Sequence, residues 1–195
     1  MATQSMQSNA PSPALHAPHD EDNQRNPSVP PGLPRREFFT RVVDRLHQEL
    51  PEERARFQHR LSTSLLKVYY ANERIHFEVW TNGPRGLLEI GLHFEDGPLS
   101  TAAYLAFFDS HIIELKHDLG SQLELERWTS SWGHLYEVSP LTKLDRVAAD
   151  RVARRLAHLI IALQPLIEAA GVPPERSVLP AEPRGPWRAW RRGRG

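Results

Sequence analysis

The spacing of hydrophobic residues divides the chain into predicted helices and strands. Spacings of three and four predict an amphipathic helix over 36–50, with Phe39, Val42 and Leu46 on one face. Pro51 either ends this helix or opens a second helical turn over 52–60. The period then shortens to two, which predicts strands over 64–70, 75–80 and 87–94, the last two joined by an NGPRG turn.

The second half of the chain repeats this change of period. A wide apolar stripe predicts a helix that is capped by Ser100 and runs to Leu119. The stretch QLELERWTSSWGHLYEVS at 122–139 predicts two short strands joined by a turn at 129–131. A sequence resembling a capping box, at 142–145, precedes a long helix that should end at Gly171.

These elements predict an α+β fold with the order α-β-β-β-α-β-β-α. About five antiparallel strands would form one sheet, with the helices packed mainly on one face. Residues 35–171 are long enough to bury a core as a single domain. The flanking segments 1–34 and 172–195 are rich in proline and poor in large apolar residues, so both are predicted to be disordered.

Composition excludes several classes of site. The 24 basic and 24 acidic residues cancel, so the whole chain carries no field that would attract nucleic acid or a membrane. Cysteine is absent, which excludes disulfides, thiolate metal ligands and a cysteine nucleophile. The sequence shows no signal-peptide pattern and no apolar run long enough to cross a membrane, so we expect a cytoplasmic protein without a membrane partner.

The C-terminal segment RGPWRAWRRGRG is the one strongly basic stretch. Arginine can neutralise phosphates and tryptophan can stack on an unpaired base, so contact with nucleic acid is one hypothesis. Docking on an acidic partner, or no role at all, are the alternatives. The candidate nucleic-acid-binding residues are Arg184, Trp187, Arg188, Trp190, Arg191, Arg192 and Arg194.

Three tryptophans form a second candidate surface. Trp80, Trp128 and Trp132 share the parity of the polar positions on their predicted strands. If they are exposed together, they mark a site for a protein partner or a second copy of the chain. If they lie beneath the first helix, they belong to the core. The sequence leaves both alternatives open.

Carboxylates on the predicted strands are the only enzymatic constellation. They would lie on faces turned away from the core, with His76 or His93 nearby, and paired carboxylates can hold Mg²⁺ for phosphodiester hydrolysis. These residues are Glu78, Glu89, Glu124, Glu126 and Glu137. The Lys that such nuclease sites commonly carry is missing after Glu124-Leu125-Glu126, and a solvated acidic face is the simpler interpretation. No catalytic residue, metal ligand or cofactor is therefore assigned.

The run IIELKHDLGSQLELERW, followed by HLYEV and a long terminal helix, resembles an uncharacterised family of bacterial α+β domains over roughly 75–170. Some members of that family occur near restriction- or defence-type proteins, and the resemblance brings no catalytic residues with it. The order of elements also resembles the secretion-chaperone fold in topology. The prediction is a non-enzymatic protein-binding or adaptor module. The alternative is a nucleic-acid-associated protein related to metal-dependent nucleases.

Overall fold

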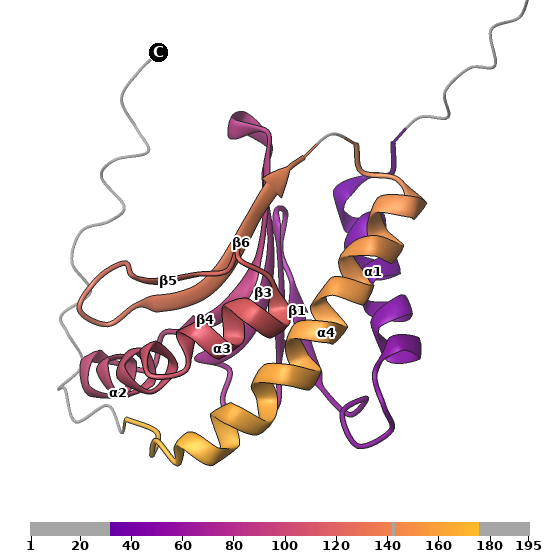
Figure 1. Cartoon of the computed structure of the whole chain (residues 1–195). Helices are drawn as coiled ribbons and strands as arrows, with labels where there is room; N and C mark the ends of the chain where they lie inside the picture. Colours follow the sequence, from indigo (N-terminus) through magenta and orange to yellow (C-terminus); the bar gives the residue numbers. More distant parts are fainter. Residues whose placement is uncertain (1–31, 142, 176–195) are drawn as a thin grey trace, which may run out of the picture. The chain divides into compact units, whose positions relative to one another are not determined.

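The computed structural model describes residues 32–141 and 143–175, which form four α-helices and one six-stranded antiparallel sheet. The α+β class and the single sheet are as predicted (Figure 1). The helices are α1 (Arg35–Glu49), α2 (Pro98–Asp109), α3 (Ile112–Leu119) and α4 (Arg146–Ala170). The strands are β1 (Gln58–Leu61), β2 (Leu65–Tyr69), β3 (Ile75–Asn82), β4 (Leu87–Phe94), β5 (Glu124–Arg127) and β6 (Gly133–Pro140).

The strands follow the order β1-β2-β3-β4-β6-β5 across the sheet. The first four pair with their neighbours in sequence, and β3 and β4 are joined by a 3-10 turn over Gly83–Arg85. Gly86 closes this turn with a φ of +63°, a backbone conformation that glycine adopts without strain. The turn fixes the register, which sets His76 opposite His93 and Trp80 opposite Glu89.

The core lies between one face of the sheet and the helices. Phe77, Val79 and Leu92 are buried on this face, and Leu156 and Leu159 of α4 belong to the same hydrophobic cluster. Helix α1 packs along α4, and α2 contacts β4, β5 and β6 (Figure 1). The period of two in the strands and the period near four in the helices therefore bury the same apolar stripes that predicted these elements.

Several boundaries differ from the prediction. The segment after Pro51 turns briefly and then forms β1, so the predicted helical turn over 52–60 is wrong. The predicted helix over 100–119 breaks between α2 and α3, at Ser110 and His111. Ser100 lies inside α2, and the Glu175 carboxylate accepts the backbone N–H groups of Leu99 and Ser100. The start of α2 thus receives its side-chain acceptor from the far end of the described chain.

Helix α4 is tied to the sheet by an ion pair. Its N-cap is Asp145 itself, whose carboxylate accepts the N–H of Ala148 at 2.9 Å, rather than the predicted cap at residue 142, which lies outside the described residues. Further along the same helix, Arg155 Nε and Nη2 donate to the two carboxylate oxygens of Glu137 on β6. Glu137 therefore faces the helices, and the expectation that it faces away from the core is wrong. Among the described helices, none is long and apolar enough to cross a membrane.

Candidate functional site

The face of the sheet opposite the helices, which we call the outer face, is polar but largely buried. The strand registers place side chains of β3, β4 and β6 next to one another on it. The buried polar residues of this face are His76, Glu78, Glu89, His93 and His134. A polar side chain that is shielded from water must find partners within the protein, so the arrangement of these five groups is informative.

The expectation of a solvated acidic face holds for Glu124 and Glu126 on β5, which are exposed, but is wrong for Glu78 and Glu89. Glu78 is 9% exposed and Glu89 is 8% exposed. Aromatic rings cover this face: the rings of His76 and His93 stack at 5.4 Å, and His134 is stacked between Tyr136 at 3.9 Å and Trp128 at 5.2 Å. These rings shield the outer face from solvent. The alternation of polar and apolar residues in the sequence does not show this shielding.

Glu78 belongs to a group that already contains a cation. Lys67 Nζ on β2 lies 3.0 Å from Glu95 Oε2 and 3.9 Å from Glu78 Oε2. His76 Nε2 lies 3.2 Å from Glu78 Oε2 and 3.9 Å from Glu95 Oε1. The Lys67 ammonium offsets one of the two carboxylate charges, so this group is an ion-pair network that already contains a cation.

Glu89 is placed differently, between two histidines. His134 Nδ1 lies 3.3 Å and His93 Nε2 lies 3.4 Å from the same oxygen, Glu89 Oε1. Burial acts to raise the pKa of Glu89, but the proximity of His134 and then of His93 outweighs it and lowers this pKa to about 2. Glu89 is therefore a carboxylate at neutral pH, and both rings lie against the same oxygen of it.

A second carboxylate, that of Glu126 on β5, lies near the other ring nitrogen of His134. His134 Nε2 is 3.5 Å from Glu126 Oε2, and the Tyr136 hydroxyl donates to that same oxygen at 3.0 Å. Burial, followed by this hydrogen bond, raises the pKa of Tyr136 to about 12. The His134 ring thus lies between Glu89, which its Nδ1 contacts within hydrogen-bond distance, and Glu126, which lies near its Nε2 without a hydrogen bond.

Two hollows open above these residues, and both are lined by Trp80, Glu89 and Trp128. The larger has a volume of about 220 Å³ and also contains His134 and Tyr136. The smaller, of about 180 Å³, extends toward β2. Pockets for drug-sized ligands span roughly 300–1,000 Å³, so each hollow is suited to one or two side chains of a partner.

The structure brings the three candidate tryptophans to one region. Trp128 is 52% exposed and Trp132 is 46% exposed, with ring centroids 6.3 Å apart, while Trp80 is half-buried across the hollow. The turn between β5 and β6 holds the first two, because the Trp128 N–H donates to the Trp132 carbonyl at 2.9 Å. Of the two alternatives for these residues, the outer surface is the one that the structure shows.

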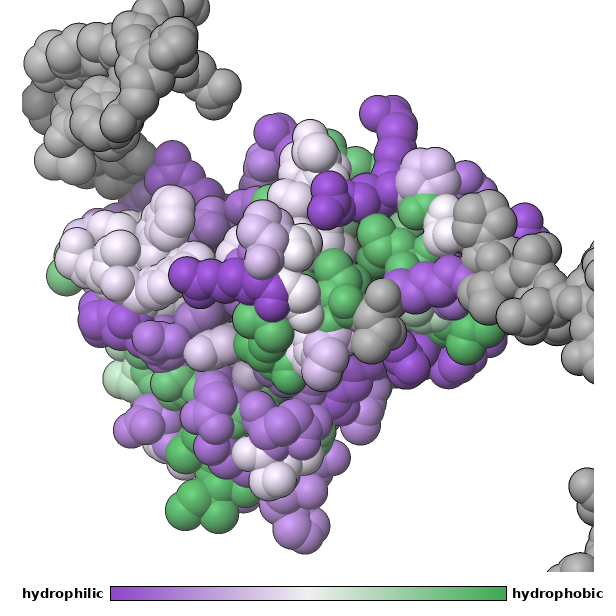
Figure 2. Space-filling model, turned by 90° about the horizontal axis from the view of Figure 1, so that it is seen from above, coloured by the Kyte–Doolittle hydropathy of each residue, from purple (hydrophilic) through white to green (hydrophobic). Residues whose placement is uncertain are grey.

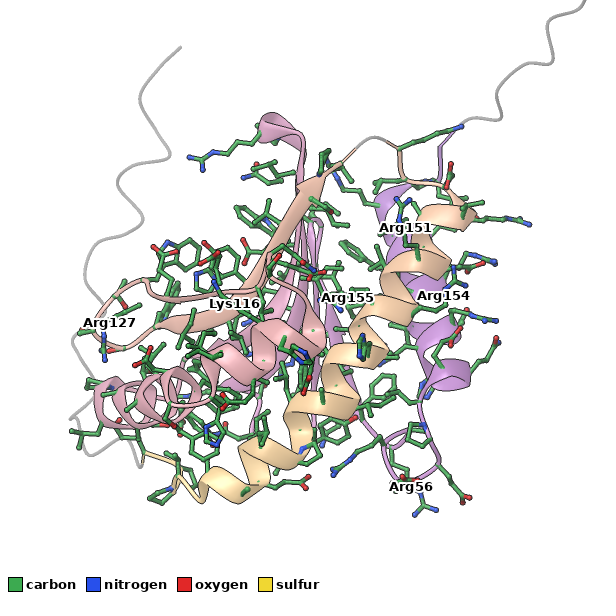
Figure 3. All side chains as sticks on the ribbon, viewed as in Figure 1. Arg56, Lys116, Arg127, Arg151, Arg154 and Arg155 are labelled. Atoms are coloured by element: carbon green, nitrogen blue, oxygen red, sulfur yellow. The ribbon has the colours of Figure 1, made fainter. Side chains whose placement is uncertain are left out.

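The candidate nucleic-acid-binding residues at 184–194 lie outside the described residues. The cations labelled in Figure 3 come from separate parts of the fold: Arg56 precedes β1, Lys116 is on α3, Arg127 is on β5 and three arginines are on α4. Arg155 among them is paired with Glu137. Seen from above in Figure 2, hydrophobic residues form separate patches between hydrophilic ones. The face seen in this view therefore carries no single broad apolar surface.

The position of His134 beside Glu89 was not predicted from the sequence, and His76 and His93 were predicted only as neighbours of the carboxylates. A usable signal was present, because the NGPRG turn fixes the pairing of His76 with His93. The pairing of His93 with His134 joins β4 to β6, which are separated by two helices and β5, and no local pattern predicts it.

No protein-family model, curated protein or solved structure matches this chain.

Proposed function

We propose that this protein is a non-enzymatic binding module that captures a segment of a partner protein on the outer face of its sheet. The observation that carries the proposal is that Trp80 and Trp128, from separate strand segments, line the same two hollows. Tryptophans at the rim of a concave site are typical anchors of protein recognition. The proposal retains the predictions of a cytoplasmic protein and of an adaptor-like role.

The shape and chemistry of the larger hollow support a side-chain anchor. Leu87 and Val138 line it together with the two tryptophans, while Glu89 and Glu126 supply carboxylates. A partner segment that inserts one aromatic or branched aliphatic side chain would bury it between the indole rings. The exposed Glu126 carboxylate would then accept hydrogen bonds from the backbone N–H groups of the segment.

A displayed library of random peptides tests this proposal. Full-length protein is the bait, and peptides that are enriched should share a large apolar anchor. Trp128→Ala should weaken binding of an enriched peptide by about 30-fold, which corresponds to loss of a hot-spot residue. Ile113→Ala is the matched control, because Ile113 is 80% exposed on α3, outside both hollows, and its loss should leave the affinity unchanged.

Two results would count against a protein-binding module. One is an enriched peptide that binds the Trp128→Ala variant as tightly as the parent chain. The other is salt-sensitive binding of labelled single- or double-stranded DNA or RNA, measured by fluorescence anisotropy, in a chain that enriches no peptide. The second result would support the nucleic-acid alternative, and loss of that binding on removal of 184–194 would assign it to the C-terminal segment.

A further inference from the structure

We propose that Glu89, His93 and His134 bind a divalent transition-metal ion of the zinc class. The three side chains come from β4 and β6, and one ligand atom from each lies within 4.8 Å of the others. This proposal concerns the floor of the outer face and does not depend on whether a peptide binds above it.

The distances fit a tetrahedral ion. Zinc bonds to nitrogen and carboxylate oxygen of about 2.0–2.1 Å place neighbouring ligand atoms about 3.3–3.4 Å apart. The two distances from Glu89 Oε1 are 3.3 Å to His134 Nδ1 and 3.4 Å to His93 Nε2. These two separations therefore already match a tetrahedral zinc site, and the ligand nitrogens of the two histidines lie within 4.8 Å of each other.

Unpartnered ring nitrogens support the site independently. His93 is 4% exposed, and its Nε2 is buried without a hydrogen-bond partner among the described residues, although it points at Glu89. The separation is short enough for an ion pair, but the angle is wrong for a hydrogen bond. A metal ion would satisfy this nitrogen, whereas leaving a buried nitrogen unpaired costs free energy.

The residues around the three ligands favour a metal ion, rather than a lysine or arginine side chain, as the positive charge at this site. Lys67 occupies the neighbouring group of Glu78 and Glu95, so that group has its positive charge already. The Glu126 carboxylate, 3.5 Å from His134 Nε2, is placed to orient the imidazole as second-sphere carboxylates do in zinc proteins. Two imidazoles with one carboxylate select zinc-class ions rather than Mg²⁺, which prefers oxygen ligands.

Three protein ligands leave the fourth tetrahedral position for water or another ligand. Glu89 and His134 both line the larger hollow, so this position is reachable from the space between Trp80 and Trp128. The metal would accordingly belong to an open site rather than to a closed structural one.

Calorimetric titration of metal-free, full-length protein with Zn²⁺ tests the proposal. We expect one Zn²⁺ per chain and no competition by Mg²⁺. His93→Gln and His134→Gln should each weaken zinc binding at least about 100-fold, beyond the 10–100-fold lost when only an outer-shell partner is removed. His76→Gln is the matched control, because His76 is as buried and stacks on His93 but belongs to a neighbouring group with Glu78, His93 and Glu95 whose ligand atoms also lie within 4.8 Å of one another. The zinc affinity of the His76→Gln variant should stay within about threefold of that of the parent chain, and a larger loss would place the ion in the neighbouring group instead.

A measurement on the parent chain guards against variants that fail to fold. X-ray absorption of the zinc complex should show two imidazoles and a further oxygen ligand in the first shell. Absence of zinc binding, or equal binding by the His93→Gln and His134→Gln variants, would overturn the proposal. So would loss of binding in a His16→Gln/His19→Gln double variant, which would assign the ion to the N-terminal segment.

Discussion

The ion pair between Arg155 and Glu137 makes a quantitative prediction about stability. Arg155 Nε lies 2.8 Å from Glu137 Oε1 and Nη2 lies 2.6 Å from Oε2, and the same Nη2 donates to the Leu119 carbonyl at 2.6 Å. The two side chains are 20% and 14% exposed. Arg155→Met removes these three hydrogen bonds and a fourth, between Nη1 and His158 Nδ1 at 3.2 Å. It leaves a largely buried carboxylate whose remaining hydrogen-bond partner among the described residues is Gln122 Nε2 at 3.1 Å.

The expected cost lies between two known limits. Loss of a hydrogen bond to a charged group costs about 1.5–3 kcal/mol, and breaking a fully buried ion pair costs about 3–5 kcal/mol. Because both side chains retain some contact with water, we expect Arg155→Met to lower the free energy of unfolding by about 2–4 kcal/mol. Arg155→Lys keeps the charge but cannot donate to both oxygens in the same geometry, so its loss should be smaller.

The neighbouring arginine is the control. Arg154 is exposed on α4, and Figure 3 shows it on the side of the helix away from Arg155, so Arg154→Met should change stability by no more than about 0.5 kcal/mol. Urea unfolding followed by circular dichroism measures the difference, provided the slope with denaturant stays the same. The double variant Arg155→Met/Glu137→Leu should recover part of the loss, because no carboxylate is left unpaired. Equal stability of the Arg155→Met and Arg154→Met variants would show that the pair does not secure α4.

Two further predictions concern Gly91 within the sheet and Tyr70, which follows the last residue of β2. A Cβ on Gly91 would lie 2.7 Å from the Leu135 carbonyl and from Tyr136 Cβ, so Gly91→Ala should cost about 1–3 kcal/mol through overpacking between β4 and β6, and an unchanged urea midpoint would contradict this contact. Burial above all raises the pKa of Tyr70 to about 12, against a weaker lowering by Arg54. Because the folded pKa exceeds the unfolded value of about 10, this stabilisation is complete below pH 10 and is lost as pH rises through 12. Alkaline unfolding should therefore be less steep in Tyr70→Phe, and identical titration curves would refute the assignment.

Local patterns predicted most of the elements because each pattern reports on a single segment. The strands β3 and β4 alternate strictly and are joined by a turn that only one register satisfies. Strand β1 was missed because its sequence, Gln58–Leu61, has a single apolar residue and its side chains are mostly exposed. The break between α2 and α3 was missed because the apolar stripe continues through it on both sides.

The candidate site was predicted only in part, for a physical reason. The parity of Trp80 and Glu89 is visible in the sequence, so their common face could be predicted. Their surroundings depend on the pairing of β4 with β6 and on rings from β5 and β6. Burial and the pKa of Glu89 are set by these distant partners, and a segment-by-segment interpretation therefore gave a solvated carboxylate where the structure has a buried one.

The packing of α1 against α4 joins two helices that are synthesised at different times. Arg41 on α1 contacts Asp150 on α4 at 2.9 Å, and the two residues are 109 positions apart. At about 5–20 residues per second, a ribosome needs on the order of 5–20 seconds to add that length of chain. Throughout this interval the apolar face of α1, with Phe38, Phe39 and Val42, lacks its main helical partner. The contact between α1 and α4 can therefore form only after α4 has been synthesised, which makes it a late step when the chain folds during translation.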